Sequence, residues 1–238
     1  MYGISTFCLH QHPLAHALEE LSSRTNLVEI MDDGPHHIES TDLLESFPFR
    51  YTFHAPSRGV NIASLLEPIR RASVEVIGNC FDVAGEVGAS VVIHPGYFAW
   101  EQEREPALRQ MERSIHELAQ RASEGGVTFY IENMGNWNYF FLRDPSELGI
   151  IDGVGLALDV GHAHLNHCLP GFLEASISHV HIHDNDGSED SHLPVGRGTI
   201  DFLPVLRAIR RDNAVPVIEV ATLEGTDESI RALDRLQE

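Results

Sequence analysis

Short apolar segments of strand type alternate with helical patterns along the whole chain, and this alternation limits the possible folds more than any other feature. The strand candidates cover residues 3–9, 27–31, 50–55, 90–95, 128–133, 155–160, 178–183 and 216–221. The clearest helix candidates cover 64–87 and 105–124, and shorter ones cover 13–23, 41–46, 144–148, 170–175, 201–211 and 227–237. Eight β–α units in a chain of this size predict an α/β fold, a closed (β/α)8 or TIM barrel, with residues 1–238 as a single domain.

The sequence predicts neither a membrane span nor a secretion signal. No apolar run approaches the roughly 18 residues that a transmembrane helix needs. The first twenty residues, MYGISTFCLHQHPLAHALEE, lack a basic segment followed by an apolar core. Cys8, Cys80 and Cys168 are widely spaced and odd in number, so neither a disulfide framework nor a zinc ribbon is indicated. We therefore expect a cytoplasmic protein.

The charge of the chain excludes some chemistry and disfavours some partners. The formal net charge is −20, and all 16 basic residues are arginine because the chain contains no lysine. Schiff-base mechanisms and lysine acid–base catalysis are therefore excluded. An acidic surface of this kind repels the phosphates of nucleic acid, so we expect a small-molecule substrate rather than DNA or RNA. The sequence leaves the oligomeric state open.

Histidine and acidic residues stand at the ends of the last six predicted strands. In a β/α barrel these ends meet at one rim, where the active sites of such barrels lie. Several buried acidic and imidazole groups would repel one another and lose hydration there unless cations compensated them. Imidazole nitrogen together with carboxylate oxygen suits Zn²⁺, Mn²⁺ or Fe²⁺. The sequence thus predicts a metal site built from His54, His94, Glu132, Asp159, His181 and Glu219.

Two further pairs have spacings that suit the same site. Asp159 and His162 are three residues apart, so both side chains can face the barrel mouth if the strand turns after Asp159. Asp190 and His192 are two apart, which places both side chains on one side of an extended loop.

Seven motifs of the chain resemble those of the xylose isomerase-like barrel superfamily and, within it, endonuclease IV. They are FHAPSRGVNIAS, VVIHPG, YIENMGN, LDVGHAH, HIHDN, DSHLPVGRG and VIEV. The resemblance to endonuclease IV implies three metals. His54, His94 and Glu132 would hold the first, and Glu132 would bridge to a second held by Asp159, His181 and Glu219. The third would be held by His162, Asp190 and His192. Isomerase and epimerase members use one metal, at the positions of Glu132, Asp159, His181 and Glu219, so the expected cofactor is one to three divalent ions, Zn²⁺ or Mn²⁺.

Two enzymatic functions fit this set of residues. The first is a metal-dependent isomerase or epimerase acting on a sugar, sugar phosphate or related polyol through an enediolate. The resemblance implies proton transfer by Glu132 and Glu219, with His162 as a further catalytic group. The second is an endonuclease IV-type phosphoester hydrolase, which the complete ligand set favours. The acidic segment 31–37 and the net charge argue against DNA. A non-enzymatic metal-binding protein is a third possibility.

Residues outside the ligand set are candidates for substrate contacts or for support of the ligands. Trp100 and Trp137 lie in loops where aromatic faces could stack on a sugar. Arg58 could meet a substrate phosphate, and Arg197 is a candidate substrate-binding arginine after the seventh strand. Glu29 and Asp32 could support the site or touch the substrate. The other charged residues of the segment 178–198 are expected to face solvent, pack or support the ligands; they are His179, His183, Asp184, Asp186 and Glu189.

Overall fold

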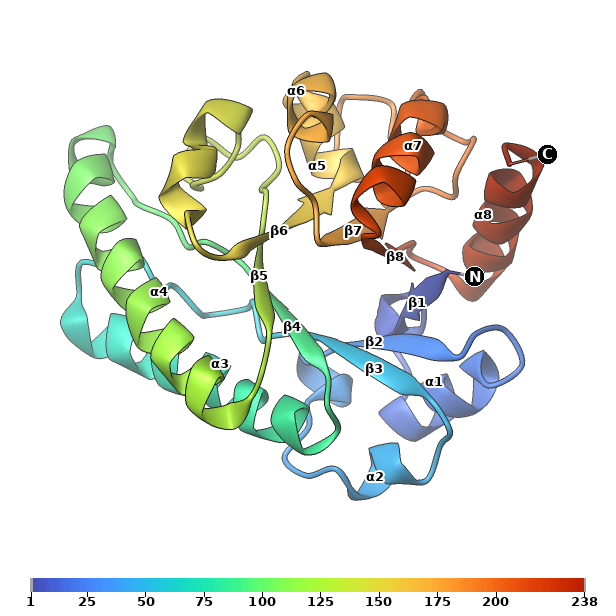
Figure 1. The fold of residues 1–238 in the computed structure, drawn as a ribbon, viewed down its shortest axis with the longest axis horizontal. Helices are drawn as coiled ribbons and strands as arrows, with labels where there is room; N and C mark the ends of the chain where they lie inside the picture. The colour runs from blue at the N-terminus through green and yellow to red at the C-terminus, as the bar shows by residue number, and fades with distance from the viewer. Residues whose placement is uncertain (1, 238) are drawn as a thin grey trace.

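The computed structural model describes residues 2–237 and contains a closed barrel of eight parallel strands. The strands pair in chain order, and β1 pairs with both β2 and β8, which closes the barrel (Figure 1). They are β1 Gly3–Ser5, β2 Leu27–Met31, β3 Arg50–His54, β4 Ser90–Ile93, β5 Phe129–Glu132, β6 Gly155–Asp159, β7 His179–Ile182 and β8 Val215–Ile218. The predicted single-domain (β/α)8 barrel is confirmed, and each predicted strand range overlaps an observed strand.

Helices connect the strands and cover the outside of the barrel (Figure 1). The α-helices are α1 Leu14–Leu21, α2 Asp42–Glu45, α3 Glu67–Glu86, α4 Arg104–Gly125, α5 Val160–Leu165, α6 Leu169–Leu173, α7 Phe202–Asp212 and α8 Leu223–Arg235. Four short 3-10 helices are η1 Thr6–Leu9, η2 Gly34–His36, η3 Glu101–Glu103 and η4 Pro145–Ile151. None of the helices in residues 2–237 has both the length and the apolar composition needed to cross a membrane.

Three of the differences between the observed elements and the sequence expectation have a clear local cause or consequence. The first strand ends at Ser5, because the Ser5 side chain accepts a hydrogen bond from Phe7 N (3.2 Å) and starts η1. The predicted helix at 144–148 is the 3-10 helix η4, which Asp144 caps by accepting from Ser146 N. The sequence did not predict α5 as a separate helix; its cap is Asp159, at the end of β6.

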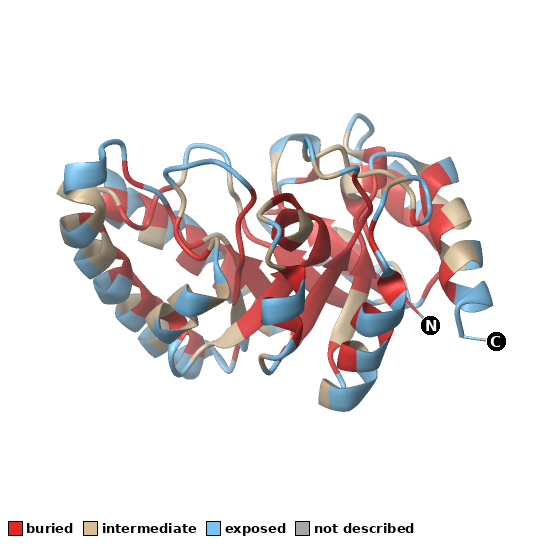
Figure 2. Cartoon of the chain, turned by 90° about the horizontal axis from the view of Figure 1, so that it is seen from above, coloured by how far each residue is buried: buried red, intermediate tan, exposed pale blue. Residues whose placement is uncertain are grey.

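The apolar core lies between the strands and the helices, and Figure 2 shows buried strands surrounded by helices whose outer faces are exposed. Alternate residues of the strands, such as Val28, Ile30, Val180 and Ile182, are fully buried and apolar. The residues between them point to the barrel interior, since successive side chains of a strand alternate. Several of these interior residues are polar, and they form the features described below.

Candidate metal centre

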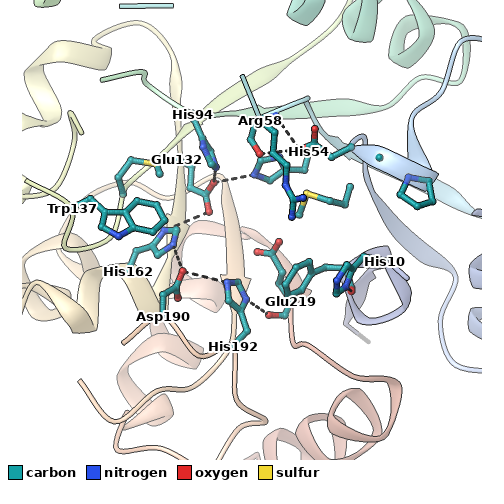
Figure 3. A pocket seen from close by; sticks show the side chains of 17 residues that line it. His10, His54, Arg58, His94, Glu132, Trp137, His162, Asp190, His192 and Glu219 are labelled. Carbon is teal, nitrogen blue, oxygen red and sulfur yellow. Dashed lines mark hydrogen bonds and ion pairs between the residues drawn. The ribbon is translucent and has the colours of Figure 1, made fainter. Parts of the chain in front are cut away.

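A cavity of about 280 Å³ opens at the carboxyl ends of the strands (Figure 3). The predicted site residues that line it are His54, Arg58, His94, Glu132, Trp137, His162, Asp190, His192 and Glu219. Asp159 and His181 are fully buried and each lies within 4.0 Å of a residue that lines the cavity. The fold therefore brings all nine predicted ligands to one mouth, as barrel topology requires for strand-end residues.

The first ligand group consists of His54, His94 and Glu132, from the ends of β3, β4 and β5. The Nε2 atoms of His54 and His94 lie 3.2 Å and 3.1 Å from Oε2 of Glu132. The Nδ1–H of His54 donates to the carbonyl oxygen of Ala55 (2.9 Å), which leaves Nε2 free to bind a metal. The three ligand atoms lie within 4.8 Å of one another, so they can share one ion.

The second group consists of Glu132, Asp159, His181 and Glu219, all of them buried. Nδ1 of His181 lies 2.7 Å from Oε1 of Glu132, 3.2 Å from Oε2 of Glu219 and 4.0 Å from Oδ2 of Asp159. Oε2 of Glu132 faces the first group and Oε1 faces the second. Glu132 is therefore oriented as a bridging carboxylate.

Asn133 fixes the position of Asp159. Its side-chain carbonyl accepts from Asp159 N (2.7 Å), and its amide nitrogen donates to the Asp159 carbonyl oxygen (3.0 Å). The Asp159 carboxylate accepts from His162 N (2.6 Å) as the N-cap of α5. The turn predicted after Asp159 thus brings Asp159 and His162 to the same site.

The third group contains a histidine that sequence reasoning did not assign as a ligand. His183, Asp190 and His192 offer ligand atoms within 4.8 Å of one another. His162, the expected third member, also reaches this group, because its Nε2 lies 3.1 Å from Oδ2 of Asp190. His183 is fully buried and stacks on His192 at a centroid distance of 3.9 Å. Its position two residues after His181 is the signal, since such residues share a strand face.

Gly161 makes room for His183. A Cβ atom at Gly161 would lie 2.0 Å from Cε1 of His183, closer than any real contact allows. The glycine of the DVGHAH motif is therefore required by the imidazole packed against it, which belongs to a different βα unit.

Asp184 organises the loop that carries Asp190 and His192. Its buried carboxylate accepts hydrogen bonds from four backbone amides: Asn185 N (2.9 Å), Gly196 N (2.9 Å), Gly198 N (2.9 Å) and Ile200 N (3.1 Å). The amide and carbonyl of Asp184 also pair with those of Leu193, at 2.8 Å each. These bonds hold the two ends of the loop together and so place its middle over the site.

Two of the four predicted substrate residues line the cavity, and two do not. Arg58 and Trp137 line it, and the loop of Arg58 is held by Ser57, whose N and Oγ donate to Asp33 at 3.1 Å and 2.9 Å. Arg197 instead pairs with Glu228 (3.0 Å), with 65% of its side chain exposed. Trp100 is 67% exposed and outside the cavity lining. We therefore do not retain Arg197 and Trp100 as substrate contacts.

The charges at the mouth fit a cationic cofactor. Within residues 2–237, the ionic partners of the carboxylates of Glu132, Asp159, Asp190 and Glu219 are all histidines, with no arginine among them. Oδ1 of Asp190 and Nδ1 of His183 are buried without a hydrogen-bond partner. Buried carboxylates need compensating positive charge, and this nitrogen and oxygen donor set is one that Zn²⁺ and Mn²⁺ bind.

The pKa values of the metal-free site show where protons replace that charge. Burial lowers the pKa of His54, but the hydrogen bond and charge of Glu132 outweigh it and raise the pKa to about 9. Burial also lowers the pKa of His192, but Asp190 outweighs this effect and raises the pKa to about 9. Burial dominates at His94, so its pKa is lowered. Burial tends to raise the pKa of Glu132, but His181, His54 and His94 hold it well below its usual range.

Comparison with known proteins gives a consistent set of relatives. The family model described as a xylose isomerase-like TIM barrel matches residues 26–236. An uncharacterized protein of Methanocaldococcus jannaschii is 35% identical, over 99% of this chain and 98% of its own length. A probable endonuclease 4 of Mycobacterium leprae is 25% identical, over 81% of each chain.

Solved structures share the fold over nearly the whole chain. A D-tagatose 3-epimerase-like protein superposes with a TM-score of 0.89 and 26% identity, covering 99% of this chain and 96% of that one. The IOLI protein with a bound zinc atom superposes with a TM-score of 0.74 and 18% identity, covering 99% and 96%.

The raised histidine pKa values predict opposite pH trends for the Tm of the metal-free protein and for the increase in Tm that Zn²⁺ gives. A group whose pKa is raised on folding stabilises the fold below its unfolded pKa, and this contribution is lost as the pH rises through the folded pKa. The Tm of metal-free protein should therefore fall between about pH 6.5 and about pH 9, the range set by His54 and His192. The increase in Tm given by Zn²⁺ should grow over the same range, because fewer protons must be displaced. Thermal unfolding with and without Zn²⁺ measures both, and an increment that shrinks with rising pH would contradict the assignment.

Gly161→Ala should disturb the third ligand group through His183. The added methyl group would displace a buried ring, so we expect a loss of about 1–3 kcal/mol in the free energy of unfolding and weaker binding of one metal ion. Urea unfolding and metal analysis measure the two effects. Gly149→Ala is the matched control, since a Cβ there meets nothing within 4 Å. If the two variants have the same free energy of unfolding and the same metal content, the ring of His183 has room to move.

Proposed function

Since this chain belongs to the xylose isomerase-like TIM barrel family, we propose that it is a metal-dependent isomerase or epimerase acting on a sugar, sugar phosphate or related polyol. The observation that carries the proposal is a pair of buried glutamates at the floor of the cavity. Glu132 and Glu219 come from opposite parts of the barrel, yet both contact Nδ1 of His181, at 2.7 Å and 3.2 Å. The likeness to a D-tagatose 3-epimerase-like protein supports this class of reaction.

Glu132, Asp159, His181 and Glu219 would hold the divalent metal that this reaction needs. When bound, it would supply a Lewis acid that polarises the substrate carbonyl and favours removal of a neighbouring proton. Zn²⁺ or Mn²⁺ fits these four ligands, and the zinc atom bound to the structurally similar IOLI protein supports zinc.

The two glutamates would carry the proton transfer. One carboxylate removes the proton from the carbon next to the carbonyl, and the other carboxylic acid returns a proton to the opposite face. This exchange inverts that carbon or moves the carbonyl, depending on which atom is reprotonated. Its neighbouring histidines keep the pKa of Glu132 low against the effect of burial, so the carboxylate is ionised and able to accept a proton.

His162 would assist from the cavity wall. In the metal-free site burial lowers its pKa, but Asp159, Asp190 and Glu132 outweigh that effect and hold it well above the usual range, which favours the protonated ring. Its Nδ1–H donates to the carbonyl oxygen of Asn133 (2.9 Å), which leaves Nε2–H near Asp190 at the cavity surface. In that position His162 can donate to a substrate oxygen on which negative charge develops.

The cavity suits a small substrate. Its volume of about 280 Å³ lies near the lower end of the range for small-molecule sites. Trp137 offers an aromatic face for a sugar ring, and Arg58 offers a guanidinium group for a phosphate or carboxylate.

A phosphoester hydrolase of the endonuclease IV type is the second candidate function. The three ligand groups that converge around Glu132 favour it, and the probable endonuclease 4 of Mycobacterium leprae is a relative. The net charge of −20 and the absence of lysine disfavour a DNA substrate.

Proton exchange with solvent tests the leading function directly. In D₂O, Mn²⁺- or Zn²⁺-loaded protein should introduce deuterium next to the carbonyl of at least one member of a panel of ketoses and ketose phosphates, as measured by NMR. Glu219→Gln should slow this exchange by about 10²–10⁴-fold, the usual contribution of a positioned acid or base. Glu101→Gln, an exposed change of the same kind, should leave it unchanged.

The same preparation also distinguishes the second function. A panel without exchange, together with cleavage of an abasic-site duplex or a simple phosphodiester, would replace the isomerase with the hydrolase. Metal content must be measured for each variant, because Glu219 is also a predicted ligand and its substitution can release the ion.

A further inference from the structure

A second polar layer lies inside the barrel, next to the metal ligands. Its centre is Glu29 of β2, which is fully buried. Its carboxylate oxygens lie 2.8 Å from Nε2 of His179 and 2.8 Å from Nε2 of His181, and Oε2 also accepts from the Thr52 hydroxyl (3.0 Å). Since β2 and β7 are not neighbours in the barrel, these contacts cross its interior.

We propose that Glu29 is a positioning residue that holds His181 with its Nδ1 atom free for the metal. A neutral imidazole has one N–H and one acceptor nitrogen. If Nε2–H points to Glu29, the lone pair of Nδ1 faces the carboxylates of Glu132, Glu219 and Asp159, as the ligand geometry requires. Carboxylates that hold a metal-binding histidine in this way also make the ligand nitrogen more basic.

The two oxygens of Glu29 have separate partners, which distinguishes this role from plain core packing. Oε2 accepts from the Thr52 hydroxyl and lies 2.8 Å from Nε2 of His179, whereas Oε1 faces His181. Oε1 and Nε2 of His181 lie 2.8 Å apart, and neither atom forms a hydrogen bond within residues 2–237; Nε2 of His179 also forms none. Each atom is therefore the available partner of the other, in a place where an unpaired polar group is costly.

The burial of Glu29 supports the same assignment. A fully buried carboxylate is costly unless it is paired, and an apolar side chain at this position would complete the strand LVEIM without that cost. The contacts of Glu29 explain its presence, because Oε1 reaches the ring that forms the floor of the second ligand group. Glu29 thus adds a negative charge to the surroundings of His181 from the side opposite Glu132 and Glu219.

The test measures metal affinity rather than turnover. Glu29→Gln keeps the size of the side chain and removes its charge, so affinity for one Mn²⁺ or Zn²⁺ per chain should fall about 10–100-fold, as found for similar partners of metal-binding histidines. Competition with a chelator measures this affinity for each bound ion. Glu228→Gln, which removes a surface carboxylate that pairs with Arg197, should leave every affinity unchanged.

A second variant separates positioning from stability. His179→Gln removes the partner of Oε2 and leaves the contact from Oε1 to His181, so it should lower the Tm with less than a threefold change in metal affinity. Equal losses of affinity in the His179 and Glu29 variants would overturn the positioning role, as would wild-type affinity in Glu29→Gln.

Spectroscopy of the wild-type protein tests the inference without any variant. In metal-loaded protein labelled with ¹⁵N-histidine, NMR should show His181 with its proton on Nε2 and the metal on Nδ1. The reverse arrangement would overturn the inference.

The inference rests on the metal binding in the proposed function and not on its reaction. If the protein binds metal with His181 in this tautomer but exchanges no substrate proton, the isomerase function is refuted and the positioning role of Glu29 is not.

Discussion

The arrangement at the barrel mouth depends on the buried carboxylate of Glu132. One of its oxygens meets His54 and His94, and the other meets His181, so β3, β4, β5 and β7 converge on a single side chain. A charge buried in this way is tolerated only with positive partners. The histidines supply that charge when they are protonated, and a bound metal ion can supply it in their place. The stability of the mouth and its chemistry therefore rest on the same contacts.

The fold and the strand-end ligands could be predicted because both follow from regular geometry. Alternation of strand and helix patterns determines the barrel, and parallel strands deliver their final residues to one rim whatever the intervening loops do. This is why His54, His94, Glu132 and Glu219 could be placed together from sequence alone. The resemblance to known motifs was needed for Asp190 and His192. Their loop lacks the regular alternation of side chains that would predict in which direction they point.

The residues whose surroundings sequence reasoning left open depend on contacts between distant segments. Arg197 lies in a glycine turn, and its direction is decided by Glu228 on α8, so it faces solvent. Glu29 stands in an otherwise apolar strand, and its partners on β7 lie about 150 residues further along the chain. The position of His183 could have been predicted from the sequence, because the alternation of β7 carries His179, His181 and His183 to the same interior face.

The loop held by Asp184 has an evolutionary consequence. One carboxylate accepts hydrogen bonds from amides at both ends of the loop, so the loop is closed at its base before it reaches residues 186–189, most of which are exposed. Insertions or deletions within 186–189 can therefore be accommodated while the base of the loop keeps its anchor. The length of the loop can thus change at this tip without rebuilding the centre beneath it.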